Sequence, residues 1–164
     1  MKGLGIIAGL LALTGCGPSD KLPEEDIAGT VSLPKGLTVF AACGTSIGRV
    51  YYQEPEDGGG WEDDRVTGGR YVFGRDGAGK LHILYYAAGR QWVDEAADGG
   101  TVVEVRSRPE DAGVEALVYY PESGVMETYS VHGVADGGRW LLWTSNKHVV
   151  GVLTKVAAYR AKCA

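Results

Sequence analysis

The chain has 164 residues, of which 45% are apolar and 23% are charged, and its formal charge is -5. This composition is typical of one soluble globular domain. A collagen-like fibre, a coiled coil and a polytopic membrane protein are excluded, because there is no strict glycine period, no long heptad pattern and no apolar run near about 20 residues. The negative charge also argues against nucleic-acid binding, which needs basic residues against phosphates.

The N-terminal residues are organised like an export signal. Lys2 precedes an uncharged, mostly apolar run over 3–13, which is too short to span a bilayer as a helix. The run ends at Leu13-Thr14-Gly15-Cys16, which resembles the lipobox of bacterial lipoproteins. A plain secretory signal or a short buried helix ending in Cys are the alternatives.

The resemblance to lipoproteins implies where the mature protein resides. It implies export, cleavage before Cys16, and acyl chains such as palmitate on that residue. Gly17 in place of Asp implies sorting to the outer membrane, facing the periplasm, if the source is Gram-negative. The expected organisation is a signal peptide over 1–15, a lipidated Cys and polar tether over 16–26, and a single β domain over 27–164.

Two cysteines remain in the domain, Cys43 near its start and Cys163 near its end. An oxidising compartment favours a disulfide between them. Two buried free thiols are the alternative, whereas a redox pair would normally show Cys-x-x-Cys spacing, which is absent. We therefore expect a structural disulfide.

Short runs of β-branched and aromatic residues fill the domain, separated by turns rich in Asp and Gly. No segment has the period of a three-turn amphipathic helix. We expect strands near 27–33, 37–43, 48–54, 69–75, 80–87, 90–96, 101–107, 114–120, 124–132, 138–146 and 152–162.

The spacing of these strands predicts an all-β fold. Connections of two to six residues imply an antiparallel meander. A Cys43–Cys163 bridge would join the first and last strands, and this favours closure into a lipocalin-like barrel over a β-sandwich. A partial propeller is disfavoured because no internal repeat is visible.

The domain also resembles small uncharacterised secreted proteins of proteobacteria. The resemblance rests on Cys43-x-x-Ser46-x-Gly48-x-x-Tyr51-Tyr52, on Gly60-Trp61-Glu62-Asp63-Asp64 before Gly68-Gly69, and on the C-terminal Cys163. It implies a β fold with paired cysteines and no particular activity.

Several motifs that suggest catalysis are better explained as turns. Residues 44–48 match the Gly-x-Ser-x-Gly elbow of hydrolases, but the flanking segments are strand-like and a β-turn is expected there. Residues 74–80 come close to a phosphate-binding loop but lack its Ser/Thr and its helix. The three histidines, His82, His132 and His148, have no metal-ligand spacing, so no metal is expected.

The acidic segment 54–64 and the aromatic residues are the remaining candidates for a site. The segment has six carboxylates and no Lys or Arg, but Arg65 stands where a calcium-binding EF-hand loop needs Glu, so a solvated loop is expected. Three Tyr-Tyr pairs should each place one ring on either side of the sheet. Of Trp140 and Trp143, which face opposite sides, one should be in the core. The candidate binding residues are Trp61, Glu62, Asp63, Asp64, Tyr51 and Tyr52.

These observations favour a lipid-anchored envelope lipoprotein with a binding or structural β domain, no catalysis and no cofactor. Its expected partners are the membrane, reached through the anchor, and an envelope protein, a glycan or a small apolar ligand. The alternative is an envelope hydrolase that uses Ser46 or the carboxylates of the acidic loop.

Overall fold

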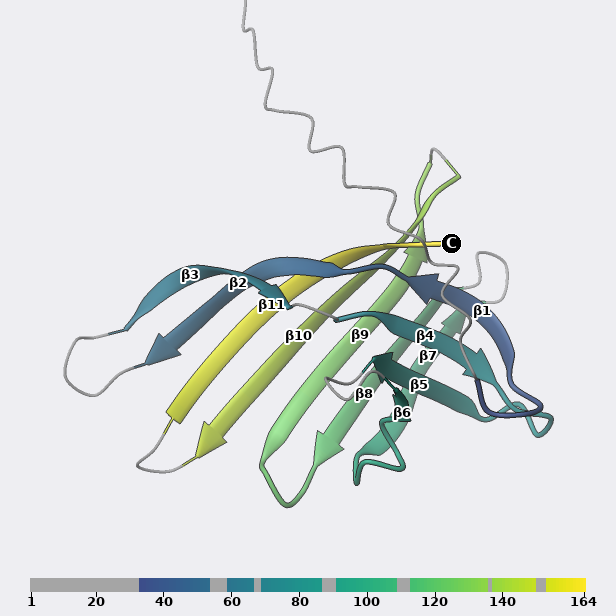
Figure 1. Ribbon diagram of the computed structural model, residues 1–164, viewed down its shortest axis with the longest axis horizontal. Helices are drawn as coiled ribbons and strands as arrows, with labels where there is room; N and C mark the ends of the chain where they lie inside the picture. The colour runs from purple at the N-terminus through teal and green to yellow at the C-terminus, as the bar shows by residue number, and fades with distance from the viewer. Residues whose placement is uncertain are drawn as a thin grey trace, which may run out of the picture.

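The computed structural model describes residues 33–53, 59–66, 69–86, 91–108, 113–135, 137–149 and 153–164. These residues form one antiparallel sheet and no helix (Figure 1). The expected signal peptide, tether and lipidation site at Cys16 lie outside the described residues. So does the expected strand over 27–33, except for residue 33, which is not in a strand.

Eleven strands make up the described part of the domain. They are β1 (Thr38–Cys43), β2 (Ser46–Gln53), β3 (Gly60–Val66), β4 (Tyr71–Arg75), β5 (Leu81–Tyr86), β6 (Trp92–Asp94), β7 (Thr101–Arg108), β8 (Gly113–Tyr120), β9 (Val125–Gly133), β10 (Arg139–Val149) and β11 (Leu153–Cys163). The expected all-β fold is confirmed. The expectation of a solvated loop over 54–64 was wrong for residues 60–64, which belong to strand β3 because they pair in register with β2.

The strand order departs from a simple meander at β11. Nine strands follow the order β6-β5-β4-β1-β11-β10-β9-β8-β7, and β2 and β3 branch from this path. One edge of β11 pairs with β10, while the other pairs with β2 over 154–160 and with β1 at Cys163. Strand β11 therefore pairs along one edge with two separate groups of strands, the hairpin of β2 and β3 and the group that begins with β1.

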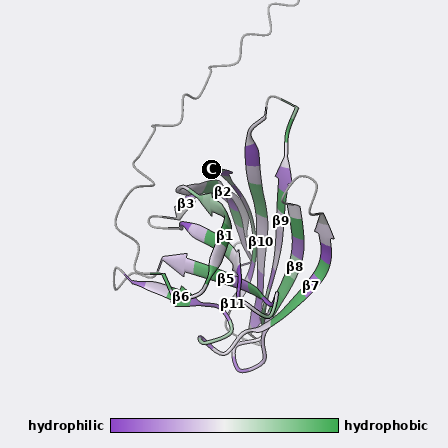
Figure 2. Ribbon diagram, turned by 90° about the vertical axis from the view of Figure 1, so that its right-hand side faces the viewer, coloured by the Kyte–Doolittle hydropathy of each residue, from purple (hydrophilic) through white to green (hydrophobic). Residues whose placement is uncertain are grey.

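The sheet curls into a half-barrel whose concave side is filled. Strands β7 to β11 form one curved wall (Figure 1). We call β4, β5, β6 and the turn at 95–99 the cover, because their side chains contact the wall. Figure 2 shows β5 and β6 on the side opposite β7, β8 and β9. Along the strands, hydrophilic and hydrophobic residues alternate in Figure 2, as expected for a sheet with one buried face.

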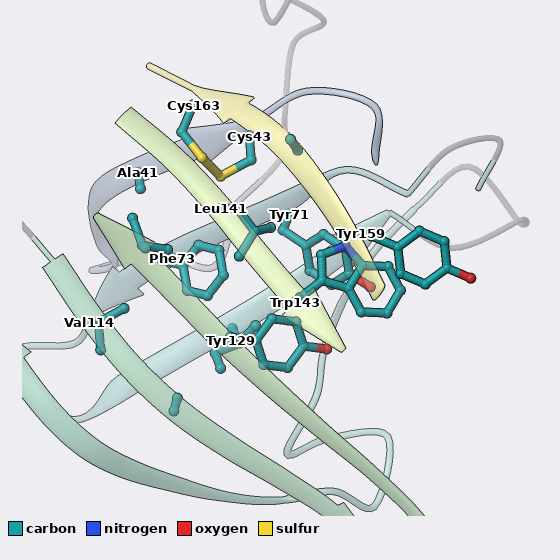
Figure 3. Close-up of a cluster of buried hydrophobic side chains, with 14 of the residues drawn as sticks. Ala41, Cys43, Tyr71, Phe73, Val114, Tyr129, Leu141, Trp143, Tyr159 and Cys163 are labelled. Carbon is teal, nitrogen blue, oxygen red and sulfur yellow. A yellow bond between two sulfur atoms is a disulfide. The ribbon is translucent and has the colours of Figure 1, made fainter. Parts of the chain in front are cut away.

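Aromatic side chains fill the space between the wall and the cover. Tyr71 and Phe73 of the cover contact Tyr129 of β9, with ring centroids 5.4 and 6.0 Å apart. Trp143 of β10 stacks on Tyr159 of β11 at 4.1 Å (Figure 3). Trp143 is thus the tryptophan of β10 that lies in the core, as predicted.

The predicted disulfide between Cys43 and Cys163 is confirmed. These two residues are register partners, so the bond joins the first strand to the last at one end of the core (Figure 3). Ala42 and Ala164 add two backbone hydrogen bonds beside it. The bond therefore fixes the end of β1 against β11, and β4, the first strand of the cover, pairs with β1.

The Tyr-Tyr pairs alternate across the sheet as expected. Tyr52, Tyr85 and Tyr120 pack against the core. Tyr51 instead contacts Trp61, Tyr86 contacts Trp92, and Tyr119 is 45% exposed.

Strand β7 contains an irregularity that the alternation pattern did not reveal. Glu104 pairs with Ala116 but Arg106 pairs with Glu115, so Val105 is an extra residue without a register partner. This bulge turns Arg106 to the face opposite Glu104. The strict alternation of a regular strand therefore ends at Glu104 in β7.

Candidate functional site

The candidate site lies on the hairpin of β2 and β3 beside β11. Seven residue pairs align β3 with β2, from Ser46 and Val66 to Tyr52 and Gly60. Strand β3 has no further neighbour among the described strands. Its three consecutive carboxylates discourage pairing with another sheet, and this leaves the edge accessible.

An open pocket of about 740 Å³ lies where these three strands meet. Its volume falls in the range of pockets that bind small molecules. It is lined by Ile47, Gly48, Arg49, Trp61, Asp63, Asp64, Ala158, Tyr159 and Arg160.

One aromatic platform and two cations stand at this pocket. Trp61 is 52% exposed, and its ring lies 5.6 Å from that of Tyr51. The guanidinium of Arg49 lies 3.2 Å from a carboxylate oxygen of Asp63, and both side chains are exposed. The guanidinium of Arg160 lies 5.7 Å from the centroid of the Trp140 ring. The pocket thus offers a flat apolar surface beside charged hydrogen-bonding groups.

A glycine and a buried tyrosine hold β3 in position. Gly48 is the register partner of both Tyr159 on β11 and Asp64 on β3. The Tyr159 hydroxyl donates a hydrogen bond of 2.7 Å to Asp64, so the side chain crosses over Gly48. Burial and this carboxylate raise the pKa of Tyr159 and keep the hydroxyl protonated as a donor.

The structure separates the six candidate residues into two groups. Trp61, Asp63 and Asp64 line the pocket, and Tyr51 contacts Trp61. Tyr52 instead packs against the core, with Lys155 5.7 Å from its ring centroid. Glu62 is exposed but is not among the lining residues.

Six of the nine lining residues were not among the sequence-based candidates, and three of the six have polar side chains: Arg49, Tyr159 and Arg160. Arg49 is on β2, whereas Tyr159 and Arg160 are on β11, more than 100 positions away in the chain. Arg49 could have been found from cross-strand pairing with Asp63, given the hairpin. The other two depend on the pairing of β11 with β2, for which the sequence shows no local signal.

Ser46 is built into the core. Its side chain is fully buried, and its hydroxyl donates to the carbonyl of Gly69 at 2.8 Å. It also accepts a hydrogen bond of 3.0 Å from the Trp143 indole. These contacts give Ser46 a packing role and no access to a substrate.

Residues 74–80 form a hairpin turn, as predicted. The Asp76 carboxylate accepts hydrogen bonds from the backbone of Ala78 and Lys80, and Gly79 has a φ of 81°. His82, which follows, lies between Asp94 at 2.6 Å and Asp76 at 3.3 Å. These carboxylates raise the pKa of His82, Asp94 having the larger effect.

Within the described ranges, no group of three or more His, Cys, Asp or Glu side chains could hold a metal ion. The same residues contain no helix long and apolar enough to cross a membrane. No protein-family description, curated protein or solved structure matches this chain.

Proposed function

We propose that this protein is a lipid-anchored envelope lipoprotein that binds a saccharide in the pocket between β2, β3 and β11. The observation that carries the proposal is the exposed Trp61 ring at a pocket that also contains Arg49, Asp63 and Arg160. The lipobox-like residues that end at Cys16 support the location.

The chemistry of the pocket suits a sugar better than an apolar ligand. A pyranose ring has an apolar face that packs on an indole, and its hydroxyls accept and donate hydrogen bonds around its rim. Arg49 and Asp63 present donors and acceptors in the same small area. An apolar ligand would displace water from this exposed ion pair and offer no hydrogen bonds in return, which is costly.

Trp61→Ala is expected to weaken saccharide binding by about thirtyfold, because truncation of a central aromatic residue costs about 2 kcal/mol. Isothermal titration calorimetry measures this with two probes, a tetrasaccharide of N-acetylglucosamine and soluble peptidoglycan fragments. Both are glycans of the kind that an envelope protein meets.

Tyr119→Ala is the matched control for this experiment. Tyr119 is also an exposed aromatic residue on a strand, and it does not line the pocket. Its replacement should leave the dissociation constant unchanged. Equal affinity of the Trp61→Ala variant and the wild type, or no binding of either probe by the wild type, would contradict the proposal.

Cys16→Ser is expected to move the protein from the membrane fraction to the soluble fraction of cells that export it. Each buried CH₂ of an acyl chain contributes about 0.8 kcal/mol, so removal of the chains abolishes stable anchoring. Fractionation and intact-mass measurement of the membrane-bound wild type test this. Recovery of the variant in the membrane fraction, at the level of the wild type, would argue against the anchor.

A further inference from the structure

Two glutamates meet inside the half-barrel, away from the pocket. Glu95 belongs to the turn at 95–99 of the cover, and only 1% of it is exposed. Glu127 is on β9, two residues before the buried Tyr129, and so it faces the same interior. Neither residue has a part in the proposed saccharide site.

The hydroxyl of Tyr129 joins the two carboxyl groups. It lies 3.0 Å from Oε1 of Glu95 and within hydrogen-bond distance of Oε2 of Glu127. A tyrosine hydroxyl has a single hydrogen, so it donates to only one of these oxygens. The other contact is a hydrogen bond only if that carboxyl is protonated and donates to the tyrosine oxygen. Both contacts are hydrogen bonds at the same time only when the glutamate pair carries one proton.

The surroundings favour that proton. The groups that face Glu95 are Glu127 and Tyr129 of β9, Tyr120 of β8, Tyr71 of β4, Tyr85 of β5, and Asp94 and Asp98 of its own segment. None of them is a cation. Glu127 faces Tyr129, Ser145 of β10 and Lys155 of β11. Two negative charges here would be close together, poorly solvated and opposed by one lysine.

These hydrogen bonds cross the line along which the barrel closes. Among the described strands, β6 at the end of the cover and β7 at the end of the wall are not paired. Two of the side-chain connections between the cover and the wall lie at this gap. Glu95 accepts from Tyr120 and contacts Tyr129 on the wall. The second connection runs from Arg75 of β4 to Glu104 of β7, at 2.5 and 2.9 Å.

We propose that one proton shared by Glu95 and Glu127 locks the cover onto β8 and β9, and that loss of this proton at alkaline pH opens the half-barrel along the β6–β7 gap. With both carboxylates charged, one contact of Tyr129 is lost and the glutamates repel each other. The arrangement makes closure of the domain sensitive to pH.

The direction of the pH dependence follows from the protonation equilibrium. Burial first, and then the charge of Glu127, raise the pKa of Glu95 to about 8, and burial also raises the pKa of Glu127. An unfolded chain would lose these protons near the ordinary glutamate pKa. The folded state thus holds more protons between that value and about pH 8, so stability falls as the pH rises through this window.

The test compares thermal unfolding of the wild type and of Glu95→Gln between pH 6 and pH 9. The wild-type midpoint should fall by about 5–10 °C. The midpoint of Glu95→Gln should fall much less, because an amide is neutral and keeps a donor at every pH. His82, whose pKa is raised by its two carboxylates, loses its proton in both proteins and accounts for the fall that they share. Hydrogen exchange, corrected for its intrinsic pH dependence, should accelerate in 95–99 and in β7 of the wild type but not in the centre of β10.

Two further variants keep the test decisive. Glu122→Gln, at an exposed turn, should show the wild-type pH dependence. Glu127→Gln also places a neutral donor beside Tyr129, and it takes over the test if Glu95→Gln does not fold. A midpoint that falls equally in the wild type and in both buried variants, or exchange that accelerates evenly over the sheet, would overturn the proposal.

Discussion

Reduction of the Cys43–Cys163 disulfide is expected to lower the free energy of unfolding by about 4–5 kcal/mol. The bond closes a loop with a sequence separation of 120, and constraint of so long a loop removes much of the entropy of the unfolded chain. It also connects Cys43 and Cys163, which are the register pair between β1 and β11 among the described residues. Loss of the bond should therefore loosen the start of the cover as well.

Urea unfolding of the same chain with and without a phosphine reductant measures this effect. The Cys16→Ser variant is used so that no third thiol takes part. Because both sulfurs are buried, Cys43→Ala together with Cys163→Ala provides a second measurement without a buried hydroxyl. If the free energy of unfolding falls by less than about 1 kcal/mol in both comparisons, the unfolded chain does not gain the expected entropy when the bond is absent.

Gly48→Ala is expected to destabilise the protein by about 3 kcal/mol or more and to disrupt the pocket. A Cβ atom at this position would lie 2.0 Å from the carbonyl oxygen of Ala158 and 2.7 Å from the Cα atom of Tyr159. These are backbone atoms of the neighbouring strand, so no rotamer change relieves the overlap. Strand β2 must move away from β11, and the hydrogen bond from Tyr159 to Asp64 is then lost.

Gly60→Ala is the matched control for Gly48→Ala. Gly60 lies in the same hairpin, and no atom stands within 4 Å of the position its Cβ would occupy. Its replacement should change stability by less than about 1 kcal/mol. Urea unfolding and the saccharide titration are measured on both variants. Equal stability of the two would refute the close approach of β2 and β11 at Gly48.

The disulfide and Gly48 act in different parts of the molecule. The disulfide stabilises the junction between β11 and the cover, whereas Gly48 allows β2 and β3 to lie close against β11. Loss of binding without loss of the cover is expected for Gly48→Ala. The reduced protein should instead show its largest increase in hydrogen exchange near Cys43 and Cys163.

The alternation of residues revealed part of the interior in advance. In β9, strict alternation puts Val125, Glu127, Tyr129 and Val131 on one face, and this face is the buried one. A glutamate among apolar residues on a core face already indicates a group with special partners. Glu95 gave no such signal, because it follows a three-residue strand in a turn and is buried only by the wall opposite.

Short-range features of the sequence determined the β class, most turns and the pairing of the cysteines. Asp-Gly turns and alternating runs involve only a few neighbouring residues, so they are visible in the sequence without knowledge of the fold. The cysteine pairing was predicted from the number of cysteines and from the oxidising compartment that the export signal implies. Trp61 was a candidate binding residue from the sequence, and its ring is exposed although its segment proved to be strand β3.

Only the tertiary structure decided the strand order at β11, the pocket and the glutamate pair. Pairing between strands more than 100 residues apart depends on how the whole sheet curls, and no local pattern encodes it. The pocket contains Arg49 and Arg160 because β2 lies against β11. Likewise, Glu95 and Glu127 share Tyr129 because the cover folds onto the wall. Contacts of this kind depend on how all the strands of the domain pack together, so they cannot be predicted from local sequence patterns.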